Sequence, residues 1–584
     1  MLRAVIPPSS SKRRHLLGLA SLPLVLALGA CTPEVQPVTP GQPGPTTTAV
    51  VSAAPTAKPA APKVDVYAPQ GPFGEEVFVA VAEAPLAKGA LTLEKAPAGV
   101  TKAPAVCAEY AKNKATEVPA CGDRQTALAA LDKALALATP GADGSAPAEA
   151  AVKARDAALA ALEGCAGVPA GVIRALRADL LPAACGDVLA EPILKAPPKE
   201  LRADVHEALF GMALAARLSR AGGAFPVLAA PFTKERVEKH VKGPIATWMK
   251  DVATALQAMS DSASKLHNYG GAIAAVAAGV ADLALVEAVR GAPIPDDMAK
   301  DEERRNIYYA SLDEQLEPRK RRGRDAALVG LLKFAEVGAI HDARVREARR
   351  LLSKLYGGRR IDALDRLMVP AAPAPGAASV EERLAARLPT FYSGLLLDSK
   401  GVTQAGVLAG LANQGLPLAH RQALRATPPS GDLAPHVARA HLSLGQLYWR
   451  AVDFEEAAKA MSLVPAASRS PETKLLAALA IGLRGGPKDA AEMMVKLPLG
   501  MNLPGQRAAL DALSAEGTPM SGPASFDSGY LMEIAAPERA DGVYFRSIAK
   551  RYRAAVDLLT DPKQKAEASE RAASAEAIAG EIKQ

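Results

Sequence analysis

The sequence predicts a mainly all-α fold, and three features of its composition support this prediction. Aromatic residues make up only 4% of the 584 residues, Ala and Leu are abundant, and runs of β-branched residues are sparse. Apolar residues recur at three- and four-residue intervals through most long segments, which is the spacing of one helix face. Helices that pack through small side chains fit this composition better than a sheet does.

The first element is a segment with the features of an export signal. A positive patch at residues 12–14 precedes an apolar run over residues 16–30. The run is shorter than the about 20 residues that a permanent membrane-spanning helix needs. It ends in Leu28-Gly29-Ala30-Cys31, which resembles the lipobox of bacterial lipoproteins. The resemblance implies cleavage before Cys31 and a lipid on its thiol, and we expect no other cofactor.

Lipidation would attach the processed chain to a membrane with its body outside the cytoplasm. Each buried methylene of an acyl chain contributes about 0.8 kcal/mol, so two or three chains make a durable anchor. In the lipoprotein family an Asp after the cysteine tends to retain the protein in the inner membrane, so Thr32 favours the outer membrane. Processing removes four basic residues and no acid, which lowers the net charge from +7 to +3. This low charge and the compartment argue against nucleic acid as a partner.

A Pro-rich linker follows the lipidated cysteine. Eight prolines lie between Thr32 and Lys63 among Thr, Ala, Val and Gly. Such a segment favours extended conformations of about 3.1 Å per residue, so it could hold the body up to roughly 100 Å from the lipid. Beyond it, residues 77–81 and 90–93 could form two short strands, a small β element near residues 75–95.

Four further cysteines lie close together in the sequence and predict two disulfides. They are Cys107, Cys121, Cys165 and Cys185. An even number of cysteines in an exported chain is typical of disulfides, and three pairings are open. Cys121 and Cys185 lie in similar motifs, Pro-Ala-Cys-Gly-Asp and Pro-Ala-Ala-Cys-Gly-Asp. If each is the second cysteine of a local loop, the similarity favours the pairs Cys107–Cys121 and Cys165–Cys185. No Cys-x-x-Cys pair or nearby His suggests a metal site.

Helices are expected from Asp123 onwards. Asp123 is placed as an N-cap for a helix that Pro140-Gly141 would end, and a second helix is expected from Pro147 to Gly164. Helical patterns also cover residues 201–222 and 233–289. The stretch from Gly270 to Leu285 is very apolar, but Asp282 interrupts it, so we expect a buried helix there.

A strongly basic segment extends over residues 317–366. It holds fourteen basic and seven acidic residues, a net charge of +7. A solvated helix face is the simplest interpretation, and a docking surface for lipopolysaccharide, a wall polymer or an acidic protein is the alternative. The docking surface would be formed by the cluster at its start, Arg319, Lys320, Arg321, Arg322 and Arg324.

The segment Val437–Pro465 has the pattern of a helical hairpin. Leu444, Gly445 and Tyr448 precede Phe454 and Ala457 at helical spacing, and the pattern resembles one tetratricopeptide repeat. The resemblance implies that Gly445 permits close approach of the two helices, that Tyr448 fills the space below, and that Ala457 is the small residue that the facing helix requires. His441 stands where the family has a large residue, which is a departure from the pattern.

Other segments extend this resemblance. Ala490 follows Ala457 by thirty-three positions, close to the family period of 34, and residues 352–370 echo the hairpin with a shorter turn. An α-solenoid of stacked hairpins is therefore expected, with a concave surface for binding proteins. The predicted divisions are a signal (1–30), a lipidated linker (31–74), a disulfide region (75–196), a helical domain (197–370), a linker (371–379), repeats (380–500) and a C-terminal helical region (501–584).

We searched the sequence for catalytic patterns and expect no enzyme. It has no phosphate-binding Gly-rich loop with Lys, no His-Glu-x-x-His and no Gly-x-Ser-x-Gly. The predicted function is therefore a membrane-anchored scaffold or assembly factor that binds envelope proteins. An enzyme of peptidoglycan metabolism and a non-catalytic wall- or glycan-binding lipoprotein are the alternatives.

Overall fold

Every regular element that the structure describes is a helix, which confirms the predicted all-α class. The computed structural model describes residues 102–113, 121–139, 147–357, 360–370, 379–484, 486–495, 503–537 and 539–582. Within these ranges the only β-type pairing is an isolated bridge between Ala339 and Gly415. The signal, the lipidated linker and the predicted β element lie outside the described residues.

The first helices form a group that the two disulfides cross-link. Asp123 caps α3 as predicted, because its carboxylate accepts a hydrogen bond from the Thr126 amide at 2.9 Å. Consecutive helices from α3 to α6 pack against one another. The elements of this group are α2 (Ala105–Lys112), α3 (Arg124–Ala136), α4 (Glu149–Leu162), α5 (Ala170–Leu180), η1 (Ala183–Cys185) and α6 (Gly186–Lys195).

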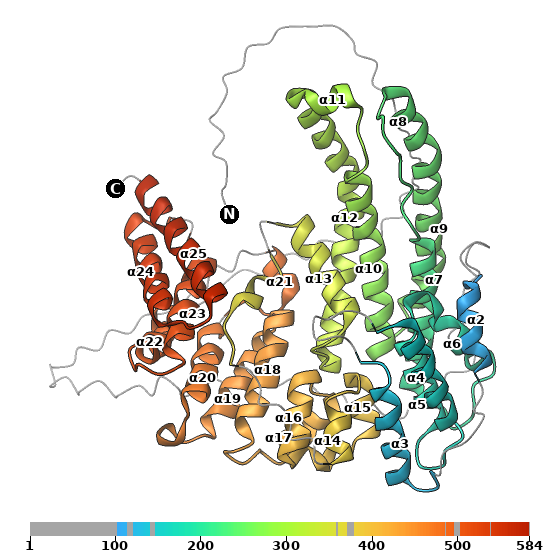
Figure 1. Cartoon of the computed structure of the whole chain (residues 1–584), viewed down its shortest axis with the longest axis horizontal. Coiled ribbons are helices and arrows are strands. Elements are labelled where there is room, and N and C mark those ends of the chain that lie inside the picture. Colours follow the sequence, from blue (N-terminus) through green and yellow to red (C-terminus); the bar gives the residue numbers. More distant parts are fainter. Residues whose placement is uncertain are drawn as a thin grey trace, which may run out of the picture. The chain divides into compact units, whose positions relative to one another are not determined.

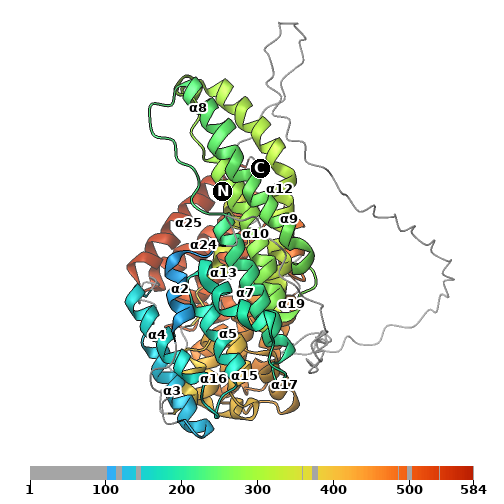
Figure 2. The ribbon, with the colours of Figure 1, turned by 90° about the vertical axis from the view of Figure 1, so that its right-hand side faces the viewer.

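Long helices follow, and α9, α10 and α12 lie lengthwise toward the same end of the fold (Figure 1 and Figure 2). The predicted helical segment 233–289 is divided into α8, a π-helical turn η2, α9 and α10, with a break at residues 264–267. The elements are α7 (Ala203–Ala221), α8 (Lys234–His240), η2 (Val241–Ile245), α9 (Ala246–Ala263), α10 (Asn268–Arg290), α11 (Asp296–Lys300), α12 (Glu302–Val337) and α13 (Ala343–Leu355).

Helix α10 is the centre of this group and packs on α7, α12 and α13. It approaches α12 closely, because a Cβ added at Gly279 would lie 2.4 Å from the Ala327 amide nitrogen. By length and composition α10 is the one described helix that could cross a membrane, and half of its most apolar stretch is buried in the fold. Asp282 in α10 is buried and bonded to arginines of α12, as expected for a core helix.

The following helices stack in a regular order. Helix α14 packs on α16, α16 on α18, and α18 on α20, which in turn packs on α22. The elements are η3 (Ala363–Arg366), α14 (Val380–Ala385), α15 (Thr390–Leu396), η4 (Ser399–Thr403), α16 (Ala405–Gln414), α17 (Leu418–Ala426), α18 (Ala434–Tyr448), α19 (Ala451–Ser462), η5 (Ala466–Ser468), α20 (Pro471–Leu483) and α21 (Ala490–Val495).

Four C-terminal helices continue the stack, each packed on the next. They are α22 (Leu503–Ser514), α23 (Ser521–Ile534), α24 (Gly542–Leu558) and α25 (Pro562–Glu581). The predicted linker at 371–379 lies outside the described residues except for Ser379, which caps α14 in a capping box. The described residues all fall within one unit by their contacts, so the described parts of the segments predicted as separate regions pack together in it.

A buried polar cluster joins three of those predicted regions. The Tyr269 hydroxyl in α10 donates to Asp179 of α5 at 2.6 Å and accepts from Arg344 of α13 at 2.7 Å. Arg344 also forms a bidentate pair with Asp342, and the Tyr269 ring stacks on Phe391 of α15 at 4.6 Å. Burial raises the pKa of Tyr269 well above its usual range, so the hydroxyl remains a donor at physiological pH.

Candidate functional site

The four predicted cysteines form two disulfides, but the favoured pairing was wrong. The bonds are Cys107–Cys185 and Cys121–Cys165, with Cα–Cα distances of 5.1 and 5.5 Å. The second loop lies inside the first, so the two similar motifs do not each close a loop of their own. The pairing depends on which helices pack together: α2 contacts α6, and this contact brings Cys107 to Cys185.

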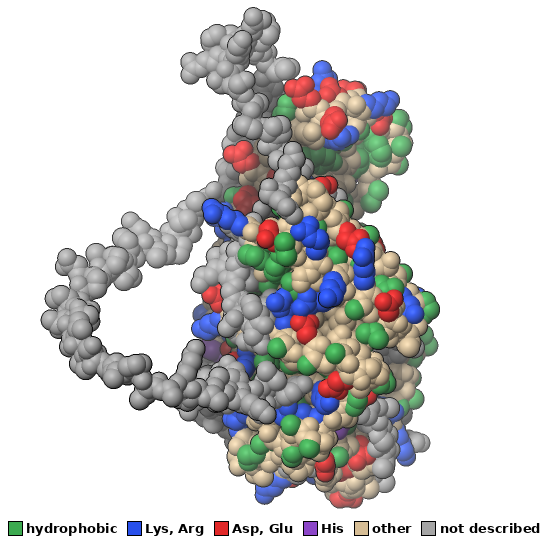
Figure 3. Space-filling model, turned by 90° about the vertical axis from the view of Figure 1, so that its left-hand side faces the viewer, with side chains coloured by type: hydrophobic (Ala, Val, Ile, Leu, Met, Phe, Trp, Pro, Cys, Tyr) green, Lys and Arg blue, Asp and Glu red, His purple; other side chains and the backbone are tan. Residues whose placement is uncertain are grey.

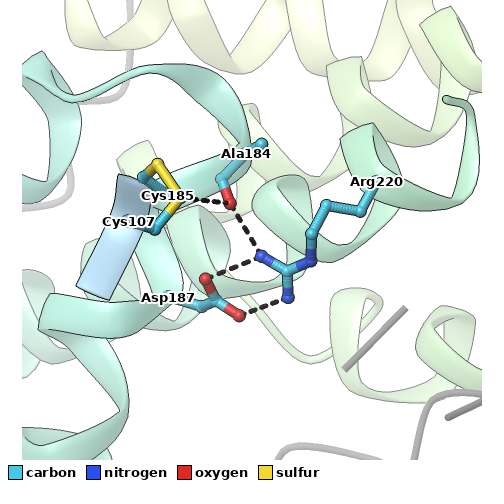
Figure 4. The surroundings of a disulfide bond; sticks show 5 residues. All are labelled: Cys107, Ala184, Cys185, Asp187 and Arg220. Carbon is cyan, nitrogen blue, oxygen red and sulfur yellow. Dashed lines mark hydrogen bonds and ion pairs between the residues drawn. A yellow bond between two sulfur atoms is a disulfide. The ribbon is translucent and has the colours of Figure 1, made fainter. Parts of the chain in front are cut away.

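Figure 4 shows the surroundings of the Cys107–Cys185 bond. Arg220 of α7 donates to the Ala184 carbonyl oxygen at 2.7 Å and forms a bidentate pair with the buried Asp187. The Cys107 sulfur lies 3.7 Å from the same carbonyl oxygen. The disulfide therefore attaches α2 to a junction of α6 and α7 that is already fixed by ionic hydrogen bonds.

The predicted hairpin at Val437–Pro465 forms as α18 and α19, which pack directly on each other. A Cβ at Gly445 would lie 2.5 Å from the Phe454 ring, so the close approach predicted for this glycine is present. Ala457 and Leu444 are fully buried. The Tyr448 hydroxyl donates to the Ala339 carbonyl oxygen at 2.7 Å and so ties the hairpin to the end of α12.

The departure from the repeat pattern at His441 has a structural reason. His441 Nδ1 lies 2.8 Å from Asp453 Oδ1 on α19, and both side chains are buried. Burial favours the neutral acid, but the charge of Arg450 and the hydrogen bond from His441 lower the pKa of Asp453. A polar bridge thus joins the two helices where the family pattern has apolar packing.

The two segments that extended the repeat resemblance differ from the hairpin. Residues 352–355 are the end of α13, and the described residues from 356 to 370 add only the 3-10 turn η3, so the predicted echo of the hairpin was wrong. Ala490 is buried at the start of α21, and the main packing partner of α21 is α12. The packing of Ala490 therefore involves the long helix as well as its neighbours in sequence.

Two arginines of the predicted anion-docking cluster are bonded to a buried acid, although the Arg322 side chain itself is 59% exposed. Arg319 and Arg322 both donate to Asp282, at 3.2 and 2.7 Å, and Asp282 is only 2% exposed. A buried carboxylate in an apolar helix needs such partners, since an unpaired buried charge destabilises a fold strongly.

The other three members of that cluster also have neighbours. Lys320 lies 4.4 Å from the centre of the Tyr356 ring, and Arg324 pairs with its neighbour Asp325 at 2.7 Å. Arg321 is exposed and 3.7 Å from Glu317. These contacts favour a structural role for the basic cluster. More generally, the face drawn in Figure 3 shows Lys and Arg side chains interspersed with Asp and Glu.

An apolar groove lies between α12 and the helices α18 and α21. Its cavity has a volume of about 230 Å³. Helix α12 contributes Leu328, Val329 and Leu332, and the opposite wall includes Tyr448, Ala490 and Ala491. Val329 and Leu332 are 50% and 42% exposed. Two neighbouring large apolar side chains exposed beside a cavity make this groove a candidate interaction site.

Acidic side chains flank this groove. Asp325 on α12 and Asp489, which caps α21 by accepting from the Glu492 amide at 2.9 Å, both line the cavity. Sequence reasoning missed the site, although a signal for it exists. Residues 326–335, Ala-Ala-Leu-Val-Gly-Leu-Leu-Lys-Phe-Ala, are apolar on nearly every side of the helix, which is more than packing on one neighbour requires.

The part of the chain that the structure describes holds no group of three or more His, Cys, Asp or Glu side chains placed to bind a metal ion. Cys31 lies outside that part. Comparison of the chain with protein-family models, with curated proteins and with solved structures found no match in any of the three.

Proposed function

We propose that this chain is an exported bacterial lipoprotein, anchored through Cys31, whose helical body binds a protein partner in the cell envelope. The observation that carries the binding function is the groove between α12 and α21, with Val329 and Leu332 exposed in its wall. Burial of these side chains against a partner would stabilise a complex by about 25 cal/mol per Å² of apolar area.

The proposed anchor and compartment are supported by two features. The sequence Leu28-Gly29-Ala30-Cys31 resembles a lipobox, and Thr32 favours the outer membrane over the inner one. The disulfides Cys107–Cys185 and Cys121–Cys165 are buried and suit an oxidising compartment outside the cytoplasm.

The proposed scaffold role is supported by the order of helix packing. The chain of contacts from α14 through α16, α18 and α20 to α22 is what an α-solenoid would have, and the α18–α19 hairpin is the part most similar to a tetratricopeptide repeat. Such stacks present extended surfaces for other proteins. The groove lies where this stack meets α12.

Photo-crosslinking in living cells tests the binding function. A photoreactive amino acid at position 332, in the groove wall, is expected to give a discrete cross-linked product with one envelope protein. The matched control is position 307, where Ile307 is 63% exposed on the same helix α12 but outside the groove. Products that are the same from both positions, or absent from position 332, would contradict a binding role for the groove.

The anchor is tested separately by fractionation. Wild-type chain is expected to float with membranes and to carry an acylated N-terminal cysteine by mass spectrometry, whereas Cys31→Ser is expected in the soluble fraction and unacylated. An unprocessed N-terminus, or the same distribution for both proteins, would reject the lipoprotein assignment.

A further inference from the structure

We infer that the groove between α12 and α21 binds an amphipathic helix that carries aliphatic side chains between basic ones. This inference rests on the proposed binding function and defines the chemistry of the partner. Its basis is the register of one face of α12, the size of the cavity and the acidic groups around it.

The exposed apolar pair on α12 lies between two acids on the same face. Asp325, Val329, Leu332 and Glu336 follow one another at intervals of four, three and four residues. Residues at such intervals line one side of a helix, and all four are exposed. The two acids are therefore about 16 Å apart along the helix axis, with the apolar pair between them.

The opposite side of α12 is used by the core. Gly330 approaches α10 so closely that an added Cβ would lie 2.6 Å from the Val276 amide nitrogen, and Leu331 and Phe334 are fully buried. Lys333 points toward the core side, where its Nζ lies 3.4 Å from the Leu266 carbonyl oxygen. The nearest lysine of α12 is thus directed away from the groove. Arg324 partly offsets the charge of Asp325, with which it pairs at 2.7 Å, and Glu336 and Asp489 add two further negative charges.

The cavity suits side chains of a macromolecule. At about 230 Å³ it is smaller than the roughly 300–1,000 Å³ of sites that enclose a small-molecule ligand. Its lining is apolar apart from the two flanking acids, so it can accept aliphatic side chains but provides few hydrogen bonds to orient a polar ligand. A helix lying in an apolar groove is an established mode of peptide recognition.

Charge then selects among helices that have an aliphatic stripe. Glu336 at one end of the pair and Asp489 across the cavity, together with the partly offset charge of Asp325 at the other end, would repel an acidic helix and attract a basic one. The complementary helix carries Lys or Arg at both ends of a three-turn span and aliphatic residues at the two positions between, in the same register as α12.

Two synthetic helical peptides test the inference on the purified full chain. Both have the same Leu and Ala residues in this register, and their charged positions are all Lys in one and all Glu in the other. Fluorescence anisotropy at low salt is expected to show binding of the Lys peptide at least tenfold tighter than that of the Glu peptide. Equal affinities, or no binding of the Lys peptide, would overturn the inference.

Three variants separate the contributions of the groove. Val329→Gln with Leu332→Gln is expected to weaken binding of the Lys peptide at least tenfold, and Ile307→Gln on the same helix is expected to leave it unchanged. Asp325→Asn with Glu336→Gln is expected to remove the preference for the Lys peptide. An equal loss with Ile307→Gln would place the binding elsewhere and overturn the inference.

The failures of the two proposals are distinguishable. If position 332 cross-links an envelope protein while neither peptide binds, the groove binds a partner of other chemistry, and the basic helix is rejected. If position 332 gives no specific product and neither peptide binds, both proposals are rejected.

Discussion

Several arginine side chains in this fold bond carbonyl groups that helix ends leave unpaired, in addition to those that pair with acids. Arg155 donates to the Ala138 and Leu180 carbonyl oxygens beyond α3 and at the end of α5. Arg421 bonds carbonyls in the last turn of α12, and Arg469 bonds two carbonyls at the end of α19. A guanidinium group suits this role because its five donors lie in one plane and remain charged. From sequence alone such residues are indistinguishable from surface charge.

One buried acid predicts a pH dependence of stability. Asp527 in α23 is fully buried, and its Oδ1 accepts from the Met368 amide at 2.8 Å. Burial raises the pKa of Asp527 to about 8. Between about pH 4 and 8 the unfolded chain has lost this proton while the folded chain keeps it, so the free energy of unfolding falls as pH rises, by up to about 1.4 kcal/mol per pH unit.

Asp527→Asn tests this dependence by removing the titration. Relative to the variant, wild-type protein is expected to lose about 2–3 kcal/mol of unfolding free energy between pH 5 and pH 7, measured by urea denaturation at both pH values. Asp297→Asn, at an exposed position in α11, is the control, and its unfolding free energy is expected to change between the two pH values by the same amount as that of wild-type protein. Parallel pH profiles for wild type and Asp527→Asn would contradict the buried-acid interpretation.

At the scale of the elements, sequence patterns located several helices but not how they pack. Asp123 and the apolar spacing after it predicted α3, and Gly445 predicted the close packing of α18 on α19. The break between α9 and α10 was not predicted, although residues 264–268, Ser-Lys-Leu-His-Asn, are mostly polar and Asn268 has a left-handed φ of 45°. The groove was missed because the sequence does not show which side of α12 packs on α10 and which side faces α21.

The contact between α10 and α12 predicts a large effect of one methyl group. In Gly279→Ala the new Cβ would lie 2.4 Å from a backbone nitrogen of α12, so the two helices must separate. The expected loss of unfolding free energy is about 1–3 kcal/mol, measured by chemical denaturation.

Gly580→Ala is the matched control for this substitution. Gly580 lies in α25 with nothing within 4 Å of an added Cβ, so the higher helix propensity of Ala is expected to stabilise the chain slightly. Equal stabilities of the two variants would show that α10 and α12 can separate at little cost.

At the scale of the whole molecule, long-range contacts determine the disulfide pairing and the packing of distant segments, which short sequence motifs do not predict. The cysteine motifs favoured two local loops, whereas Cys107 bonds Cys185 across 78 positions because α2 packs on α6. Likewise, Tyr269 connects two segments that the sequence analysis assigned to separate regions, because its hydroxyl forms hydrogen bonds with both Asp179 and Arg344. The all-α class followed from composition and periodicity, but the joining of its parts depends on pairs of residues far apart in the chain.

Removal of the outer disulfide is expected to release α2. In the chain-entropy description, a bridge across 78 residues contributes on the order of 4 kcal/mol. Cys107→Ser with Cys185→Ser is therefore expected to lower stability by that order and to speed amide hydrogen exchange in residues 105–112. Cys121→Ser with Cys165→Ser is expected to lower stability while leaving exchange in α2 slow. Unchanged exchange in the first variant would show that noncovalent packing alone holds α2.

The position of Cys107 also has a mechanical consequence. Any tension that reaches the described fold from the chain before residue 102 arrives first at α2, a helix of eight residues. Helices this short separate easily from a protein when pulled from one end, turn by turn. Here the force passes at Cys107 into a covalent bond and from there to α6, where Asp187 is held by Arg220. A steady pull on the leading segment therefore stops at the sulfur bridge, and the helices behind it are sheltered from unravelling.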